Sequence, residues 1–94
     1  MGDFSVYILH SERLNKFYIG TTDDVQRRLE EHNSSAYKDS FTTKGRPWIL
    51  FLAIEGLSSE QAYKIEKKIK SQKSSKYLLN LKQYPEIIEK LRNL

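Results

Sequence analysis

Two short apolar segments near the start of the chain, each containing a tyrosine, limit its possible folds more than any other feature. Val6-Tyr7-Ile8 and Phe17-Tyr18-Ile19-Gly20 lie on either side of a polar stretch, residues 11–15. Two apolar runs of this length joined by a short polar turn are typical of a β-hairpin. We therefore expect one strand over residues 5–9 and its antiparallel partner over residues 16–20.

Two capping patterns predict the main helices. Asp23 stands three residues before Gln26, and Ser58 stands in the same relation to Gln61. Each pair is the pattern of a capping box, which marks the start of a helix. The final helix is expected to begin with a proline, which the first turn of a helix accepts. The predicted helices cover residues 23–33, 58–71, 74–81 and 85–94.

The middle of the chain contains one more predicted strand and a loop. Residues 48–54 are apolar at every position, which is typical of a strand covered on both faces, so we expect it to be the most buried strand. Residues 34–47 are rich in Ser, Thr, Lys and Gly and predict an irregular, exposed loop. The expected fold is of the α/β class, α+β type: a small three-stranded antiparallel sheet flanked by helices.

Composition limits the class of protein. The chain has 94 residues, of which 38% are apolar, enough for one domain with one compact core over residues 1–94. It contains no cysteine, which excludes disulfides and cysteine-ligated metal sites. Asp3 stands where a signal peptide carries positive charge, and no long apolar run follows. We expect a cytoplasmic protein without membrane contact, and a monomer whose C-terminal residues cap its core.

The charge balance points to polyanionic partners. The formal net charge is +4 and the isoelectric point is about 9.3, which is the range of nucleic-acid-binding domains. A lysine-rich face is also common on helices that only interact with water, so charge alone favours that simpler interpretation. The excess of positive charge lies late in the chain, at Lys64, Lys67, Lys68, Lys70, Lys73 and Lys76.

The first predicted helix carries two polar residues next to its buried side. Successive residues of a helix are rotated by about 100°, so Val25 and Leu29 define the buried stripe. Arg28 and His32 fall beside this stripe, one turn apart. Arg27 points away from this stripe, so the rotation of the helix alone distinguishes the two adjacent arginines.

The second predicted helix shows the same anomaly. Its buried stripe contains Ala62 and Ile69, and Glu66 lies only about 40° from Ala62. A carboxylate, a guanidinium and an imidazole next to a core cost free energy unless they find partners. One interpretation is structural, with an ion pair between Arg28 and Glu66 and His32 bonded to a backbone carbonyl. The other is a catalytic site.

These residues together resemble those of a known family. Val6-Tyr7-Ile8 stands in the place of a Gly-Ile-Tyr motif, offset so that Tyr7 aligns with the motif tyrosine and without the motif glycine, and Tyr18-Ile19-Gly20 matches a Tyr-Ile-Gly motif. The run from Tyr18 to Asn33, Arg46-Pro47-Trp48 and residues 62–70 continue the likeness. The chain resembles the GIY-YIG nuclease family, and within it the small stand-alone proteins of bacteria. The likeness covers residues 4–77, which leaves residues 78–94 as a helical extension.

The resemblance implies a metal-dependent endonuclease that hydrolyses DNA phosphodiester bonds. Tyr7, Tyr18, Arg28, His32 and Glu66 would be its catalytic residues. Glu66 would hold a divalent cation, Mg²⁺ or alternatively Mn²⁺, and Arg28 would bind the nonbridging phosphate oxygens. Tyr18 is the expected general base with His32 as its proton acceptor or relay, although the residues themselves leave open which of the two is the base. Tyr7 would orient this network.

Specificity and alternative functions are less constrained. The residues expected to follow the DNA backbone are Lys44, Arg46, Lys64, Lys67, Lys70 and Lys73, and such contacts give affinity and not sequence choice. The expected substrate is duplex or branched DNA, chosen by its structure or with the help of a protein partner. Asn80 is a candidate for an asparagine found in several members of the family. The alternatives are a non-catalytic module that docks nucleic acid or a repair protein, and a structural domain.

Overall fold

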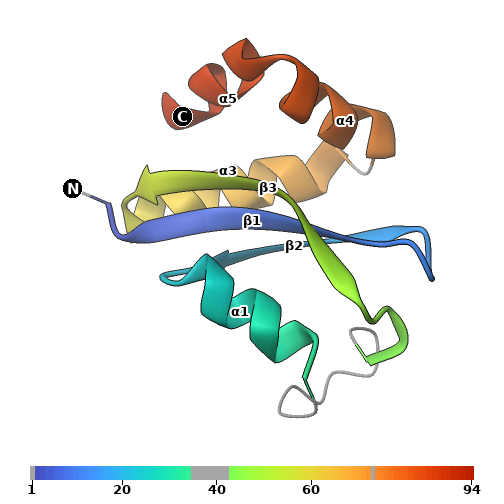
Figure 1. Ribbon diagram of the computed structural model, residues 1–94. Coiled ribbons are helices and arrows are strands. Elements are labelled where there is room, and N and C mark those ends of the chain that lie inside the picture. Colours follow the sequence, from blue (N-terminus) through green and yellow to red (C-terminus); the bar gives the residue numbers. More distant parts are fainter. Residues whose placement is uncertain (1, 35–42, 73) are drawn as a thin grey trace.

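The computed structural model describes residues 2–34, 43–72 and 74–94. Within them the chain forms a three-stranded antiparallel sheet with helices on both faces, which confirms the predicted fold class (Figure 1). In chain order the elements are β1 (Phe4–Ser11), β2 (Lys16–Thr22), α1 (Val25–His32), β3 (Trp48–Leu57), α3 (Ser59–Gln72), α4 (Ser75–Gln83) and α5 (Pro85–Arg92).

The predicted hairpin forms the centre and one edge of the sheet. The strand order is β2-β1-β3, so β1 pairs on both sides and β2 has an open outer edge among the described residues. Ile8 of β1 faces Ile19 of β2 and Leu52 of β3. Asn15, in the turn between β1 and β2, has a positive φ of 51°, a conformation that asparagine tolerates better than most residues.

The sheet separates two apolar cores where composition predicted one, because alternate side chains of a strand point to opposite faces. The larger core lies between the sheet and α3, α4 and α5, and it includes Val6, Ile8 and Ile54. The smaller one lies toward α1 and includes Tyr7 and Leu9. In Figure 1, α1 accordingly lies on one side of the sheet and the three other labelled helices lie on the other.

The expectation that residues 48–54 form the most buried strand is wrong. β3 lies at an edge of the sheet, and Ile49 and Leu50 near its start are 54% and 40% exposed. The most buried strand is β1, in which Val6, Ile8 and Leu9 are essentially inaccessible. An unbroken apolar run shows that a segment is hydrophobic, but the neighbours of a strand depend on the topology of the whole sheet.

The start of α1 differs by one residue from the prediction. The N-cap is Asp24, whose side chain accepts a hydrogen bond from the Arg27 backbone N–H at 3.0 Å. Asp23 instead forms an ion pair with the Arg27 guanidinium at 2.6 Å. The other predicted cap is confirmed, because Ser58 accepts a hydrogen bond from the N–H of residue 61. Ser74, predicted only as the start of a helix, is also an N-cap and accepts from the N–H of residue 77. Both aspartates fit the cap by sequence, so backbone geometry decides between them.

The stretch predicted as an irregular loop is only partly within the described residues. Residues 35–42 lie outside them, and Ser34 follows the end of α1 as expected. Thr43 and Lys44 are helical, however, so the described end of this stretch is more regular than predicted.

The C-terminal helices complete the larger core. Leu78 and Leu81 of α4 and Leu91 of α5 are buried in it, and Ile87 and Ile88 pack against it, as expected for a cap over the core. Hydrogen bonds hold the end of α5 to α3 and β3. No helix in the described ranges is long and apolar enough to span a bilayer.

Candidate active site

Three aromatic side chains meet on the α1 side of the sheet. The Tyr7 hydroxyl lies 3.1 Å from Nε2 of His32, within hydrogen-bond distance, and both side chains are buried. The Tyr18 ring packs edge-on against the imidazole, with 4.5 Å between centroids, and lies roughly parallel to the Tyr7 ring at 6.2 Å. The structure therefore brings together Tyr7, Tyr18 and His32, which the sequence placed in three separate elements.

Strand register explains why the two tyrosines share this face. Leu9 pairs with Tyr18, and Tyr7 pairs with Gly20, so all four positions point toward α1. A Cβ atom on Gly20 would lie 2.7 Å from the Tyr7 hydroxyl oxygen, closer than such atoms approach. The glycine of the second motif thus leaves room for the Tyr7 ring to lie across β2.

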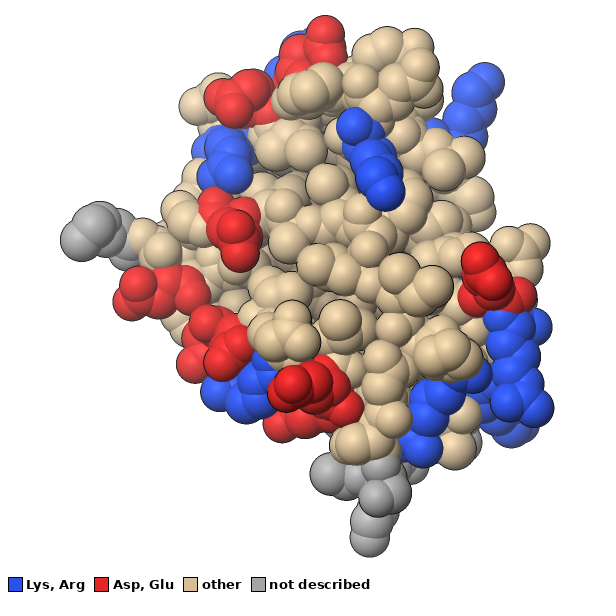
Figure 2. Space-filling view, viewed as in Figure 1, with Lys and Arg blue, Asp and Glu red and all other residues tan. Residues whose placement is uncertain are grey.

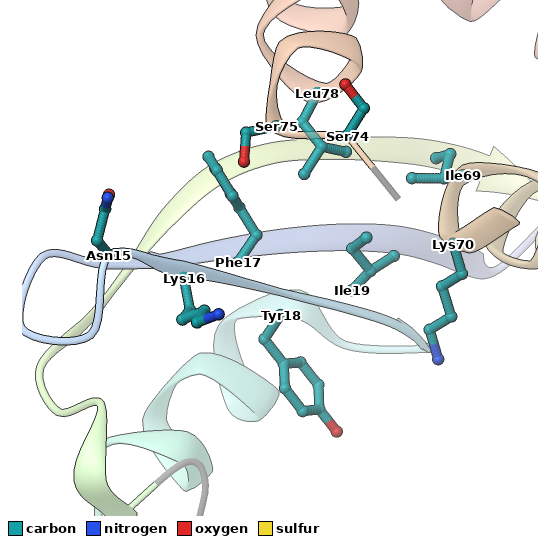
Figure 3. A pocket seen from close by; sticks show the side chains of 10 residues that line it. All are labelled: Asn15, Lys16, Phe17, Tyr18, Ile19, Ile69, Lys70, Ser74, Ser75 and Leu78. Atoms are coloured by element: carbon teal, nitrogen blue, oxygen red, sulfur yellow. The ribbon is translucent and has the colours of Figure 1, made fainter. Parts of the chain in front are cut away.

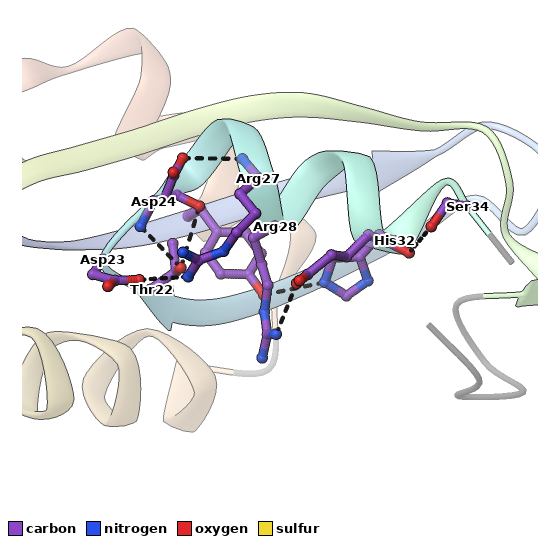
Figure 4. A network of polar contacts seen from close by, with 9 residues as sticks. Thr22, Asp23, Asp24, Arg27, Arg28, His32 and Ser34 are labelled. Atoms are coloured by element: carbon purple, nitrogen blue, oxygen red, sulfur yellow. Dashed lines mark hydrogen bonds and ion pairs between the residues drawn. The ribbon is translucent and has the colours of Figure 1, made fainter. Parts of the chain in front are cut away.

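Arg28 lies one helical turn before His32, on the side of α1 predicted by its rotation. Its side chain is 35% exposed and its Nη1 donates to Glu31 at 3.1 Å, whereas Arg27 is 54% exposed. Figure 4 shows Arg27 turned toward Asp23 and Arg28 turned away from it. The Asp23–Arg27 pair lowers the pKa of the aspartate and raises that of the arginine, mainly through their mutual hydrogen bond.

Glu66 lies on the other face of the sheet, held between β2 and its own helix. Its Oε1 accepts a hydrogen bond from Oγ1 of Thr21 at 2.5 Å, and its Oε2 lies 2.7 Å from Nζ of Lys70. The side chain is 22% exposed. Among the described residues these are its polar contacts, so the suggested ion pair between Glu66 and Arg28 does not form.

The two halves of the candidate site meet at the outer edge of β2. Tyr18 from the α1 side and Lys70 from the α3 side line the same pocket, and Lys70 contacts Glu66 (Figure 3). The structure thus groups the tyrosines with His32 and Arg28, and it places Glu66 across β2 from them without direct contact among the described atoms.

Three further residues support this site, and sequence reasoning did not give them these roles. Thr21 orients Glu66 as described above, and its position next to the Tyr-Ile-Gly motif is the only signal in the sequence. Asn33, predicted only as a helix end, exchanges two hydrogen bonds with the backbone of Trp48, at 2.6 and 2.9 Å. Arg46 donates to the backbone carbonyls of His32, at 3.0 Å, and Ser34. These bonds join the start of β3 to the end of α1.

The donor set around Glu66 suits a weakly held hard cation. Carboxylate and hydroxyl oxygens are ligands for Mg²⁺, which keeps several waters and commonly takes one or two protein carboxylates plus substrate phosphates. No group of three or more His, Asp or Glu side chains converges in the described ranges, so a metal site enclosed by protein ligands is not formed there. Glu66 with Thr21 fits a cation that completes its coordination shell with substrate.

The basic residues predicted to contact DNA are distributed unevenly. Lys64 and Lys67 are exposed on the outer side of α3, and Lys44 is exposed before β3. Lys70 has its ammonium on Glu66, and two donors of Arg46 are engaged by backbone. Lys73 lies outside the described residues. In Figure 2, acidic side chains gather at the lower left, toward α1, and basic ones lie at the lower right, toward the start of β3, with further charges of both signs over the upper helices.

Comparison with known proteins gives the context for this geometry. A protein of Acanthamoeba polyphaga mimivirus, uncharacterized by its name, is 36% identical over 64 residues, which are 66% of this chain and 39% of that protein. A structure-specific endonuclease subunit SLX1 of Meyerozyma guilliermondii is 34% identical over 80 residues, 80% of this chain and 27% of the relative. The corresponding subunit of Talaromyces stipitatus is 38% identical over 60 residues, 60% of this chain and 15% of the relative.

These relatives come from a virus and two fungi, so the expected likeness to bacterial proteins stays a prediction. The chain spans less than half the length of each relative named here. The family description "GIY-YIG catalytic domain" matches residues 3–78, which include β1 through the start of α4 and every residue of the candidate site. This chain therefore belongs to the GIY-YIG family and carries its catalytic domain.

Proposed function

We propose that this protein is a metal-dependent endonuclease that hydrolyses phosphodiester bonds of DNA and selects its substrate by structure. The observation that carries the proposal is the Tyr7–His32–Tyr18 cluster beside Arg28 in a GIY-YIG catalytic domain. Selection by DNA structure is supported by the names of the SLX1 relatives, which are structure-specific endonuclease subunits. A protein partner remains part of the proposal, because those relatives are named as subunits.

Burial divides the roles within the aromatic cluster. A general base must come within hydrogen-bond distance of the water that it deprotonates. His32 is fully buried and Tyr7 nearly so, whereas Tyr18 is partly exposed and lines the pocket at the edge of β2. Tyr18 is therefore the proposed base, His32 the group that accepts or relays its proton, and Tyr7 the residue that orients the imidazole.

The remaining residues act on the phosphate. Water attacks phosphorus, its proton passes to Tyr18, and the 3′ oxygen leaves with the bonding electron pair. Arg28 donates to nonbridging oxygens, for which a planar guanidinium is well suited. Glu66 and Thr21 would hold the cation, Mg²⁺ or Mn²⁺, and when bound it would supply Lewis-acid stabilisation of the phosphoryl charge. Because Glu66 and Tyr18 lie on opposite faces of β2, the scissile phosphate is proposed to sit at the outer edge of this strand.

Nicking of supercoiled plasmid in Mg²⁺ or Mn²⁺ tests the proposal with matched variants. Tyr18→Phe removes only the hydroxyl and should slow nicking at least ~100-fold, the scale of general acid–base catalysis. Glu66→Gln should abolish nicking while leaving the fold intact. Tyr63→Phe and Glu60→Gln change the same residue types at exposed positions of α3 and should nick at the wild-type rate.

The same experiment separates the alternatives. Equal activity of all the variants would reveal a contaminating nuclease. DNA binding without nicking by the wild-type protein, in either metal and on plasmid, duplex and branched DNA, would establish the non-catalytic binding module instead.

A further inference from the structure

A pocket of about 540 Å³ lies along the outer edge of β2, next to the candidate active site. It is lined by the hairpin residues 15–19, by Ile69 and Lys70 of α3, and by Ser74, Ser75 and Leu78 around the start of α4 (Figure 3). None of the residues assigned to catalysis above, except Tyr18, lines it. The volume falls within the range of sites that bind small ligands, ~300–1,000 Å³.

The run of five consecutive lining residues shows that the pocket faces the strand edge. Alternate side chains of a strand point to opposite faces, so a pocket on one face would collect only every second residue. In Figure 3, Phe17 points toward Ser75 and Leu78, whereas Tyr18 points to the opposite side. The open edge of β2 also presents backbone N–H and C=O groups that no described strand pairs with.

The lining combines apolar surface with positive charge. Phe17, Ile19 and Leu78 form apolar walls, and the Phe17 ring is held in place by edge-on packing against Phe51 at 5.1 Å between centroids. Lys16 and Lys70 bring two ammonium groups, of which that of Lys70 is paired with Glu66 behind the lining, and no acidic side chain lines the pocket itself. Lys16 makes no ion pair with any described residue. This chemistry suits a ligand with a flat apolar part, hydrogen-bonding groups at its rim and adjoining negative charge.

We propose that the pocket binds one unpaired nucleotide of the DNA substrate. The base packs against Phe17 and Leu78, and the phosphates on either side of it lie beside Lys16 and Lys70. The inference rests on the proposed function, because Tyr18 belongs to both the pocket and the catalytic cluster and places the bound nucleotide next to the scissile phosphate. A duplex buries its bases in stacked pairs, so this pocket would favour flaps, branches and other DNA with an unpaired position.

Another occupant of a strand edge is an extended peptide that adds a strand to the sheet. Such a peptide pairs through its backbone and has no requirement for two cations. The Lys16 and Lys70 ammonium groups and the shared Tyr18 therefore favour nucleic acid.

A single substitution can fill the pocket without touching the catalytic residues. Ser75 is exposed at the first position of α4, so Ser75→Leu should place a larger side chain beside Phe17. Ser59 is the matched control: it is the exposed first residue of α3, it follows an N-cap serine as Ser75 does, and it does not line this pocket. Thermal melting of both variants checks that the fold is retained.

The test measures binding of fluorescein-labelled flap DNA by anisotropy in EDTA, where metal-dependent cleavage does not occur. The probe carries either a normal or an abasic nucleotide at the first unpaired position. The wild-type protein and Ser59→Leu should bind the normal probe about tenfold more tightly, as expected for the loss of base stacking on an aromatic side chain. Ser75→Leu should bind both probes equally. Lys16→Gln should weaken binding of both and reduce the salt dependence by about one phosphate contact.

The outcomes separate this inference from the proposed function. If the wild-type protein binds the two probes equally, or if Ser75→Leu still discriminates between them, the pocket does not read an unpaired base, and a peptide becomes its better occupant. Nicking of plasmid by the wild-type protein would then still establish the nuclease. If Ser75→Leu binds the normal and abasic probes equally, while the wild-type protein and Ser59→Leu bind the normal probe more tightly, the result supports binding of an unpaired nucleotide in the pocket. This conclusion holds whether or not nicking is observed.

Discussion

The position of the Tyr7 side chain depends on Gly20, which has no side chain. The Tyr7 ring crosses β2 at Gly20, where a Cβ atom would collide with it, and its hydroxyl reaches Nε2 of the buried His32. Val6, which precedes Tyr7 in the first motif, points into the larger core on the other face of the sheet. The packing of the Tyr7 ring therefore requires a glycine at position 20. The absence of the glycine from the first motif does not change the position of Tyr7.

Tyr7→Phe tests the energetic role of this contact. The substitution keeps the ring but removes the hydroxyl that lies within hydrogen-bond distance of His32. A buried polar group deprived of a partner costs about 1–3 kcal/mol, so the free energy of unfolding should fall by this amount in urea titrations. Tyr63→Phe removes a hydroxyl from an exposed tyrosine and should change the same free energy by less than about 0.5 kcal/mol. Equal stabilities of the two variants would contradict the contact.

Residue periodicity alone was enough to find part of the site. The rotation of α1 distinguishes Arg28 from Arg27, and the rotation of α3 turns Glu66 toward the sheet while Lys64 and Lys67 face outward. The support given by Thr21 could not be predicted in the same way, because it depends on which helix packs over which end of β2. That is a long-range property which spacing along one element does not contain.

At the level of elements, single polar side chains determine the residue at which a helix begins. Three helices begin with a polar side chain that accepts a hydrogen bond from a backbone N–H of the first turn. The Ser58 cap lies where its capping pattern predicts it, and Ser74 caps a helix whose start was predicted without a cap. At α1 two adjacent aspartates compete. Asp24 has the extended backbone of an N-cap, and this leaves Asp23 to pair with Arg27.

Alanine substitutions at the two aspartates should have unequal effects. Asp24→Ala removes the N-cap and should lower the free energy of unfolding by about 1 kcal/mol. Asp23→Ala removes only an exposed ion pair and should have the smaller effect. Chemical denaturation of the two variants side by side measures the difference. A larger loss for Asp23→Ala would restore the capping box expected from the sequence.

At the level of the whole molecule, the two faces of the sheet carry different parts of the candidate site. The α1 face carries the aromatic cluster, and the other face carries the main core, Glu66 and the C-terminal helices. The sequence predicts the three-stranded antiparallel sheet and its helices, because each element has a local signal. It does not predict that β3 is an edge strand or that Glu66 lies across β2 from the tyrosines, because both follow from the order of the strands.

The C-terminal helix α5 belongs to this larger core and should contribute to the stability of the whole domain. Leu91→Ala removes a buried side chain and should cost about 2–5 kcal/mol of the free energy of unfolding. Leu79→Ala, the same change at an exposed position of α4, should cost less than about 0.5 kcal/mol. Thermal and urea unfolding measure both. A small effect of Leu91→Ala would mean that α5 only rests on the surface.

Because β2 carries site residues on both of its faces, insertions and deletions within this strand should disrupt the site. Tyr18 and Thr21 are separated by an odd number of steps along the strand, which sends one toward the imidazole and the other toward the carboxylate. Insertion or deletion of one residue between them would reverse this parity and turn one of the two groups to the wrong face. Insertions are therefore expected to be tolerated in the turn between β1 and β2, and the spacing within β2 to be held constant.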